Sequence, residues 1–442
     1  MLASLVVWLV TAVLCVGLLK QRLWEHKRPT LPELLRQTPW RWYLIGYPTV
    51  VVRMRWTWRR LCRVADLSIT PQPRHAVLGR SLVVSGRPMR QIPPRLGLPR
   101  VTRLGLTVRV QLHPGQTPRA LITAADAFAH AWRVHSVRVA PARRGEVLIT
   151  VIAHDPLTGV GAVPPRPSGE VLLSATVGMA ETGQPWVINL RRVPHWLIVG
   201  ATRSGKSTLL AALITELAPQ PVALVGIDCK GGVELTPFMR RLSALACTRH
   251  EALALLGDLI TEAEERMAQC REAGVRSIWE LPEDVRPAPI VAIVDEVAEL
   301  YLVDGSRAAR TEAEECSTAL LRVAQLGAAL GIHLVAAAQR LGSELGRGVT
   351  ALRAQLGGRV CHAVHDAATA EMALGDLAAD AVEVALSITE EEPGVAVTTV
   401  GGRWLRVRSA LITTQDARRA AAEYAGAARP LSSARLHDKE RP

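Results

Sequence analysis

Residues 196–217 read WLIVGATRSGKSTLLAALITEL, and they carry the strongest indication of the fold class of the chain. An apolar run leads into a G-x-x-x-x-G-K-S pattern and an amphipathic run follows it, which is the order strand, glycine-rich loop and helix of a phosphate-binding P-loop. Backbone N–H groups of such a loop and the N-terminus of its helix can surround phosphate groups. The pattern predicts an ATP-binding loop made of Gly200, Ala201, Thr202, Arg203, Ser204, Gly205, Lys206, Ser207 and Thr208.

Two residues of this loop have distinct expected roles. The Lys206 ammonium would reach the β- and γ-phosphates, and the Ser207 hydroxyl would ligate Mg²⁺. ATP and Mg²⁺ are therefore the expected cofactors, and Lys206 is expected to take part in hydrolysis.

A second buried strand is predicted within residues 288–300, APIVAIVDEVAEL, and it ends in Asp295 and Glu296. Two carboxylates after a wholly apolar strand need a partner, because an unpaired buried carboxylate is costly. A metal–phosphate site supplies one. Asp295 is predicted to hold Mg²⁺ through its water shell, and Glu296 to orient and deprotonate the attacking water.

Two more apolar runs end in polar residues. Residues 331–340, GIHLVAAAQR, end at Gln339, which is predicted to sense the γ-phosphate or the attacking water. Residues 221–232, PVALVGIDCKGG, form another predicted strand that ends near Asp228 and Lys230. These two residues either belong to the ligand site or form a local ion pair that shapes the loop, and the sequence favours neither explanation. Polar groups at the ends of several strands indicate the ligand edge of a parallel sheet.

Composition describes a folded chain of two or three domains with a basic N-terminus. The 442 residues are 49% hydrophobic and 21% charged with a net charge of +13, which excludes a disordered protein. Residues 20–63 carry eleven Lys and Arg against two acidic residues.

The seven Cys are widely spaced and never form CxxC, so neither a disulfide framework nor a zinc site is encoded. A reducing cytosol is therefore expected for most of the chain.

Residues 2–19 form an apolar run long enough for one membrane span. The rival interpretation, a cleaved signal peptide, is disfavoured because no basic residue precedes the run and no A-x-A site follows it. Basic residues directly after the run favour a cytoplasmic location for the remainder. Residues 42–52 are too short to span comfortably, so a juxtamembrane segment on anionic lipid is expected, with a short second span as the alternative.

The chain is expected to contain five segments. Ahead of the ATPase, a strand at 104–112, a helix at 117–132 and strands at 136–142 and 146–154 predict a small module without catalytic features. The segments are 1–28, a transmembrane anchor and basic flank; 29–98, a basic juxtamembrane segment and linker; 99–165, the small α+β module; 166–412, the ATPase domain; and 413–442, a C-terminal helix and charged tail.

From about residue 99 to 425 the chain resembles the FtsK/SpoIIIE family of ring-forming, DNA-pumping ATPases. The resemblance rests on an ordered set of motifs: VTRLGLTVRVQL, SVRVAP, VPHWLIVGATRSGKST, GIDCKGGVEL, EAEERM, IVDEVAEL and LGIHLVAAAQR. It implies a RecA-like P-loop ATPase sheet, a homo-hexameric ring, double-stranded DNA in the central channel and ATP hydrolysis at subunit interfaces. The expected fold class is therefore α/β, with this sheet preceded by a small α+β module and an N-terminal transmembrane helix.

The sequence departs from the family pattern in two ways. Residues 325–330 lack the arginine that is a candidate trans-acting finger, so Arg322 and Arg359 become the substitutes, each also explicable as an ordinary exposed arginine. The stretch after residue 412 is too short for a winged-helix DNA-reading domain, so directional or sequence-specific loading would come from a partner protein or would not occur. Candidate pore-loop contacts to DNA phosphates are Arg340, Arg347 and Arg353.

The resemblance favours a membrane-anchored, ATP-driven translocase of double-stranded DNA. Small single-module members with an actinobacterial composition resemble the transfer proteins of conjugative plasmids and integrative elements, so conjugal DNA transfer is the preferred role. Chromosome segregation is an alternative, as is protein export by a type VII-like ATPase, although such export ATPases typically carry several modules in tandem. A regulatory protein without motor activity is disfavoured because both Lys206 and Glu296 are present.

Overall fold

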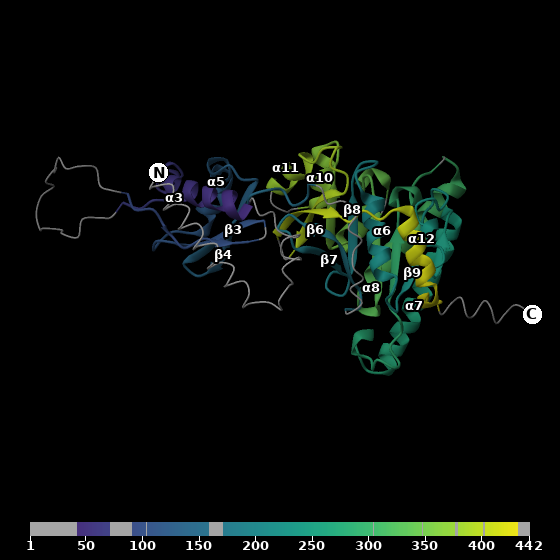
Figure 1. Cartoon of the computed structure of the whole chain (residues 1–442). Helices are drawn as coiled ribbons and strands as arrows, with labels where there is room; N and C mark the ends of the chain where they lie inside the picture. Colours follow the sequence, from purple (N-terminus) through teal and green to yellow (C-terminus); the bar gives the residue numbers. More distant parts are fainter. Residues whose placement is uncertain are drawn as a thin grey trace, which may run out of the picture. The chain divides into compact units, whose positions relative to one another are not determined.

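The computed structural model describes residues 42–70, 91–102, 104–158, 171–303, 305–346, 348–375, 379–400 and 403–431. The chain divides into two compact units, one up to Pro156 and one from Leu157 onward (Figure 1). The predicted membrane span at 2–19 lies outside the described residues. No helix among the described ranges is long and apolar enough to cross a membrane.

The N-terminal unit is a five-stranded antiparallel sheet with helices. Strand β5 lies between β3 and β4, and the short β1 and β2 both pair with β3. The predicted strand–helix–strand–strand order is confirmed, except that the helix is split at Ala124. The elements are η1 Trp42–Gly46, α3 Tyr47–Val64, β1 Arg95–Leu96, β2 Arg100–Val101, β3 Gly105–Gln111, α4 Pro118–Thr123, α5 Ala125–Trp132, β4 Ser136–Arg143 and β5 Glu146–Ile152.

Helix α3 belongs to the core of this unit. Its Val50, Met54, Trp58 and Cys62 are buried at intervals of four residues, the spacing of one helical face. Trp58 lies 5.6 Å from the Phe128 ring on α5, and its indole N–H donates to the Pro94 carbonyl at 2.9 Å. The small unit therefore begins before residue 99, since Trp42 and Val50 belong to its core, and no membrane-spanning helix is found over residues 42–52.

The C-terminal unit contains a ten-stranded mixed sheet in an α/β fold. Six strands run parallel in the order β10-β9-β11-β12-β8-β13, and β14, β15, β6 and β7 continue the sheet antiparallel. The strands are β6 Ser174–Ala180, β7 Pro185–Asn189, β8 His195–Val199, β9 Ala223–Ile227, β10 Ala244–Ala246, β11 Ile290–Val294, β12 Ile332–Ala338, β13 Gly358–His362, β14 Val395–Val400 and β15 Arg403–Ser409.

Helices cover both faces of the parallel strands, which explains why β8, β9, β11 and β12 are buried at every position. Leu197 and Val199 of β8 pack into the cluster that contains α7 and α8, whereas Trp196 and Ile198 pack into the cluster with α6. The helices are α6 Lys206–Leu217, η2 Thr236–Phe238, α7 Arg249–Glu272, η3 Ile278–Glu280, η4 Val297–Leu300, α8 Arg307–Leu330, η5 Ser343–Leu345, α9 Val349–Gln355, α10 Ala367–Leu374, α11 Ala379–Leu386, α12 Thr414–Glu423 and η6 Ala425–Ala427.

The predicted C-terminal helix is confirmed as α12, and it is part of the ATPase unit. Thr413 and Asp416 form a reciprocal capping box at its start. Its Ala417 and Ala421 are buried in the same cluster as α6. The helix thus packs on the sheet unit, while residues 432–442 lie outside the described ranges.

Candidate nucleotide site at the carboxyl edge of the sheet

The predicted P-loop leaves β8 between two parallel neighbours that fix its start. The Gly200 N–H donates to the Ala338 carbonyl at the end of β12 at 3.2 Å. The Ala201 N–H donates to the Ala363 carbonyl just after β13 at 2.8 Å. Because both neighbouring strands end at the same edge, the loop is anchored from two sides before it turns into α6.

Close backbone approach explains the second glycine of the loop. Gly205 has φ of +118°, and a Cβ there would lie 2.5 Å from the Gly394 Cα. The Gly394 N–H donates to the Ser204 carbonyl at 2.9 Å. His362 packs against the first glycine of the loop, since a Cβ on Gly200 would lie 2.7 Å from the His362 Cβ. The turn before β14 and the end of β13 therefore support the loop, and no local pattern in the sequence marks either contact.

Lys206 is the first residue of α6 and lies folded against its own loop. Its ammonium donates to the Gly200 carbonyl at 2.7 Å and to the Ala201 carbonyl at 3.1 Å. Burial lowers the pKa of Lys206, while the nearby carboxylates Glu296 and Asp295 oppose that shift. The cation is thus held at the phosphate-binding edge by groups that phosphate oxygens can replace.

The remaining loop residues differ in exposure. Thr202 and Arg203 have exposed side chains. Their expected contribution to phosphate binding is through their backbone N–H groups. Ser204 is buried, and Ser207 and Thr208 are half-buried in the first turn of α6. In P-loop proteins the serine or threonine at this position ligates Mg²⁺ through its hydroxyl, so Ser207 is placed for that role.

Asp295 and Glu296 follow β11 at the same edge, and both are buried. Burial raises the pKa of Asp295 to about 6, and the nearby charges of Asp228 and Glu234 add to the rise. A carboxylate among other carboxylates is stabilised by a cation. No group of three or more Cys, His or acidic residues in the described ranges forms a metal cage. Mg²⁺ fits nevertheless, because it is usually bound by one or two protein oxygens together with phosphates and water.

The order of the strands brings Gln339, the predicted sensor of the γ-phosphate or the attacking water, into the site. Strand β12 lies between β8 and β11, so Gln339 at its end stands between the P-loop and Glu296. The Gln339 N–H donates to Glu296 Oε1 at 3.3 Å, and its side chain is exposed. The side chain is therefore accessible at the edge where a γ-phosphate or water is expected.

Asp228 and Lys230 do not form the ion pair that was one of their two explanations. The Asp228 carboxylate accepts backbone N–H groups of Lys230 at 3.2 Å, Glu234 at 2.9 Å and Leu235 at 3.2 Å, so it shapes the loop after β9. The Lys230 ammonium instead lies 3.4 Å from Glu296 Oε2. Glu296 is therefore held between β9 on one side and β12 on the other.

Replacing Lys230 by Ala is expected to destabilise the nucleotide-free protein by about 1 kcal/mol, because Glu296, only 5% exposed, loses its cation among other carboxylates. Mg²⁺ should restore the loss by supplying positive charge. Thermal unfolding with and without Mg²⁺ measures this, with Arg240→Ala, an exposed cation of the same unit, as the control. A loss that Mg²⁺ does not reduce would contradict the explanation.

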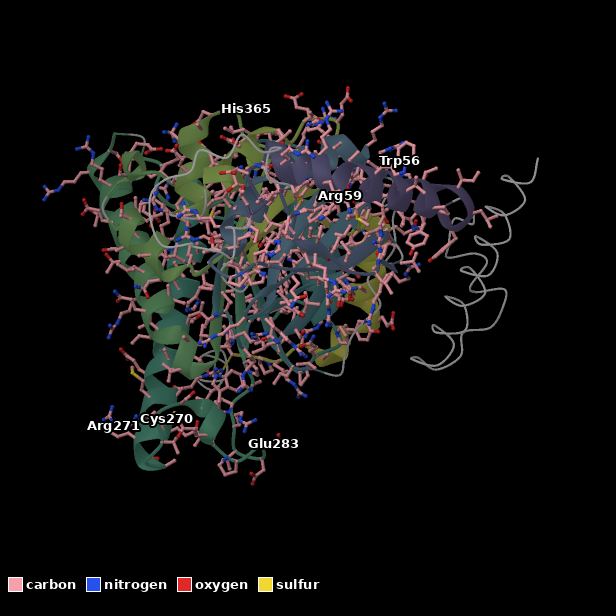
Figure 2. The ribbon with its side chains drawn as sticks, turned by 90° about the vertical axis from the view of Figure 1, so that its left-hand side faces the viewer. Trp56, Arg59, Cys270, Arg271, Glu283 and His365 are labelled. Carbon is pink, nitrogen blue, oxygen red and sulfur yellow. The ribbon has the colours of Figure 1, made fainter. Side chains whose placement is uncertain are left out.

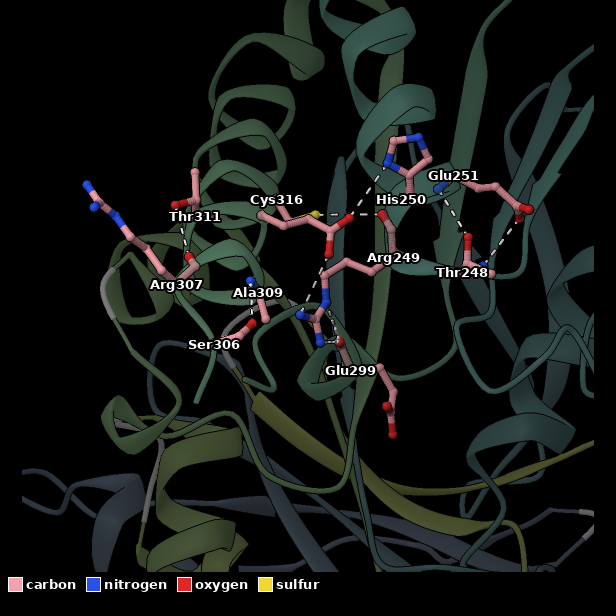
Figure 3. A network of polar contacts seen from close by, with 11 residues as sticks. Thr248, Arg249, His250, Glu251, Glu299, Ser306, Arg307, Ala309, Thr311 and Cys316 are labelled. Atoms are coloured by element: carbon pink, nitrogen blue, oxygen red, sulfur yellow. Dashed lines mark hydrogen bonds and ion pairs between the residues drawn. The ribbon is translucent and has the colours of Figure 1, made fainter. Parts of the chain in front are cut away.

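A polar network holds the segment that follows Glu296 (Figure 3). Arg249, the first residue of α7, donates to the Glu299 carbonyl through Nε at 3.2 Å and Nη2 at 3.0 Å. Its Nη1 lies 4.0 Å from Glu312 on α8. Arg249 thus ties η4 to two helices, and the sequence offers no sign of this role because the partner is a backbone carbonyl.

The candidate arginines have different surroundings. Arg322 is exposed on α8 and its side chain has no partner among the described residues. Arg359 is half-buried, donates to the Arg353 carbonyl at 2.6 Å, and has its pKa lowered by burial. Arg353 donates to the Leu341 carbonyl at 3.2 Å, and the exposed Arg340 pairs with Glu344 at 2.8 Å. Arg347 lies outside the described residues.

The fold and this edge define a P-loop ATPase. The FtsK/SpoIIIE family pattern matches residues 167–286 and 279–343, and residues 34–153 match the actinomycete conjugal transfer protein N-terminal domain. The chain is 41% identical over 365 residues to the transfer protein TraSA of Streptomyces ambofaciens, covering 79% of this chain and 86% of that protein. The chain belongs to the FtsK/SpoIIIE family.

Two further similarities are more partial. The DNA translocase FtsK of Mycobacterium tuberculosis is 34% identical over 175 residues, which is 34% of this chain and 20% of that protein. The structure of the pCW3 conjugation coupling protein TcpA with ATPgS has a TM-score of 0.53 at 20% identity, covering 73% of this chain and 90% of that one. At this identity the structural similarity concerns the fold alone.

Proposed function

We propose that this chain is an ATP-driven translocase of double-stranded DNA that serves conjugal transfer. The observation that carries the proposal is a P-loop ATPase edge in a chain similar to a transfer protein over 86% of that protein's length. A relative named as a DNA translocase supports DNA as the cargo. The N-terminal match to a conjugal transfer domain favours conjugation over chromosome segregation and protein export.

The residues at the sheet edge would divide the work of hydrolysis. The P-loop N–H groups and Lys206 would hold the phosphates, and Ser207 and Asp295 would hold Mg²⁺, which neutralises charge on the transferred phosphoryl group. Glu296 would orient the attacking water and accept its proton, with Gln339 beside it. In phosphoryl transfer, catalysis is mostly such positioning and charge stabilisation.

The proposal includes a membrane-anchored assembly. Residues 2–19 would form a single transmembrane helix with the ATPase unit on the cytoplasmic side. A RecA-like homo-hexamer would surround double-stranded DNA, and a membrane or loading partner would deliver the DNA. The basic residues near the N-terminus and the high net charge support an acidic surface as partner.

The test is ATP hydrolysis by the full chain in detergent, with and without duplex DNA. We expect strong stimulation by duplex DNA of any sequence, weakening as salt increases, because contacts to phosphates are independent of sequence and release counterions. Displacement of a third strand from a triplex would then report movement along the duplex. Turnover that ignores duplex DNA would reject the translocase and favour protein export.

Arg322 is proposed as the arginine that completes a neighbouring subunit's site. Arg322→Ala is expected to lower DNA-stimulated turnover by roughly 10³-fold, as loss of an arginine finger does. Mixing inactive Arg322→Ala chains with inactive Glu296→Gln chains should restore activity, because a mixed interface then holds one intact Arg322 and one intact Glu296. No recovery on mixing, at concentrations where wild-type chains assemble, would contradict action in trans.

A further inference from the structure

The outer face of α3, continued by η1, presents apolar and basic side chains together. Positions 45, 52, 56, 59 and 63 are spaced by seven, four, three and four residues, so they share the side of the helix opposite the buried Met54 and Trp58. Trp56 and Arg59 are labelled on this helix in Figure 2. The outer face consists of Ile45, Val52, Trp56, Arg59, Arg60 and Arg63.

This face exposes an unusual amount of apolar surface. Trp56 is 86% exposed, Ile45 62% and Val52 55%. A large aromatic residue is normally at least partly covered, and apolar groups gathered beside one another indicate a docking surface. The opposite face of the same helix is fully used by the core, so the outer face is free to meet a partner without unfolding the unit.

The charge on this face is wholly positive. Residues 42–64 contain five arginines and no acidic residue, and Asp66 follows beyond the helix. Arg53 donates to the Trp132 carbonyl at 2.7 Å and Arg55 to the Gly97 carbonyl at 3.2 Å, so these two serve the fold. The side chains of Arg59, Arg60 and Arg63 have no partner among the described residues. Three guanidinium groups are therefore available to anions.

We propose that the outer face of α3 lies on the anionic phospholipid surface of a membrane. Indole and aliphatic side chains enter the boundary between headgroups and acyl chains, while arginines bind the lipid phosphates. Duplex DNA explains the arginines but not Trp56, Ile45 and Val52, because a sequence-independent contact to the phosphate backbone uses charged and polar groups rather than exposed apolar side chains. This inference deepens the proposed membrane attachment and rests on it in part.

The predicted span would hold α3 near that surface. Residues 2–19 end 28 positions before α3 begins at Tyr47, and a fully extended chain of that length reaches roughly 95 Å at most. A weak surface contact made next to an anchor acts as an intramolecular one and needs little affinity of its own. The outer face would then set how the N-terminal unit is oriented on the membrane.

Photocrosslinking of the full chain tests this placement. Trp56→p-benzoylphenylalanine is reconstituted with vesicles of phosphatidylcholine containing phosphatidylglycerol, and lipid adducts are detected by mass spectrometry. The matched control is Ile122→p-benzoylphenylalanine, at a position 47% exposed on α4 of the same unit. We expect lipid adducts at position 56 and a loss to the level of position 122 when Arg59, Arg60 and Arg63 are all replaced by Glu.

Three outcomes would overturn the inference. They are equal lipid adducts at positions 56 and 122, adducts at 56 that survive the three Glu substitutions, or adducts at 56 with duplex DNA in place of lipid. Flotation with the vesicles reports the anchor separately: a chain that floats without adducts at 56 keeps the anchor and rejects the surface. DNA-independent ATP hydrolysis, which the three arginines do not serve, confirms that the substituted chain is folded.

Discussion

Lys206→Ala is expected to lower ATP hydrolysis by roughly 10³-fold or more, the size of effect that a cation on the transferred phosphoryl group has. Of the two cations in the P-loop, Lys206 is the one that folds against the loop and bonds to two of its carbonyls, whereas Arg203 is exposed. Alanine cannot follow the phosphates when they bind. ATP should therefore bind weakly as well, and a fluorescent nucleotide titration beside the hydrolysis assay measures both effects.

The same substitution should not harm the fold. Because burial lowers the pKa of Lys206, the folded state disfavours its charged form, and removing the side chain relieves that cost. The unfolding temperature without nucleotide should stay the same or rise, while the stabilisation by ATP disappears. Arg192→Ala, an exposed cation of the same unit, is the matched control and should leave both unchanged. An unfolding temperature of Lys206→Ala clearly below that of the wild type, both without nucleotide, would contradict this account.

Glu296→Gln is expected to abolish turnover while ATP still binds. The amide cannot accept a proton from water, and loss of a general base costs roughly 10² to 10⁴-fold in rate. Its oxygen can still accept the Gln339 N–H, so the shape of the edge is kept. We therefore expect a chain that retains unhydrolysed ATP, measured by single-turnover hydrolysis and by the nucleotide that remains bound after filtration.

Glu299→Gln is the control for this experiment. Glu299 lies on η4, three residues after Glu296, but contributes its backbone carbonyl to Arg249 rather than its carboxylate (Figure 3). Its substitution should therefore leave hydrolysis near the wild-type rate. Equal losses in both variants would mean that charge in this region, rather than a base at position 296, supports turnover.

Much of the site could be predicted because its signals are local. The glycine and lysine spacing of residues 200–207 fixes a strand, a tight loop and a helix within one short segment. The carboxylates at 295 and 296 stand out against an apolar strand, and Gln339 does so after another. In each case a few neighbouring residues carry both the secondary structure and the chemistry.

The partners of these residues could not be predicted in the same way. Lys230 was expected either to pair with Asp228 or to serve the site, and only the position of β9 beside β11 brings its ammonium to Glu296. The Gly394 N–H supports the P-loop by donating to the Ser204 carbonyl, and the Arg249 side chain supports η4 by donating to the Glu299 carbonyl. Both contacts join residues that are far apart in sequence. Hydrogen bonds to backbone leave no mark on residue type, so they carry no sequence pattern.

The N-terminal helix shows the same division. Composition and short spacing, which depend on neighbours along the chain, predict a basic, aromatic and partly apolar segment at 42–64 and a P-loop edge that binds phosphates. The folded chain, in contrast, places Met54 and Trp58 in a protein core and leaves Trp56 and Arg59 outside it. An apolar stripe has the same pattern whether it meets protein or lipid, and the choice depends on distant residues such as Phe128 that fold against it.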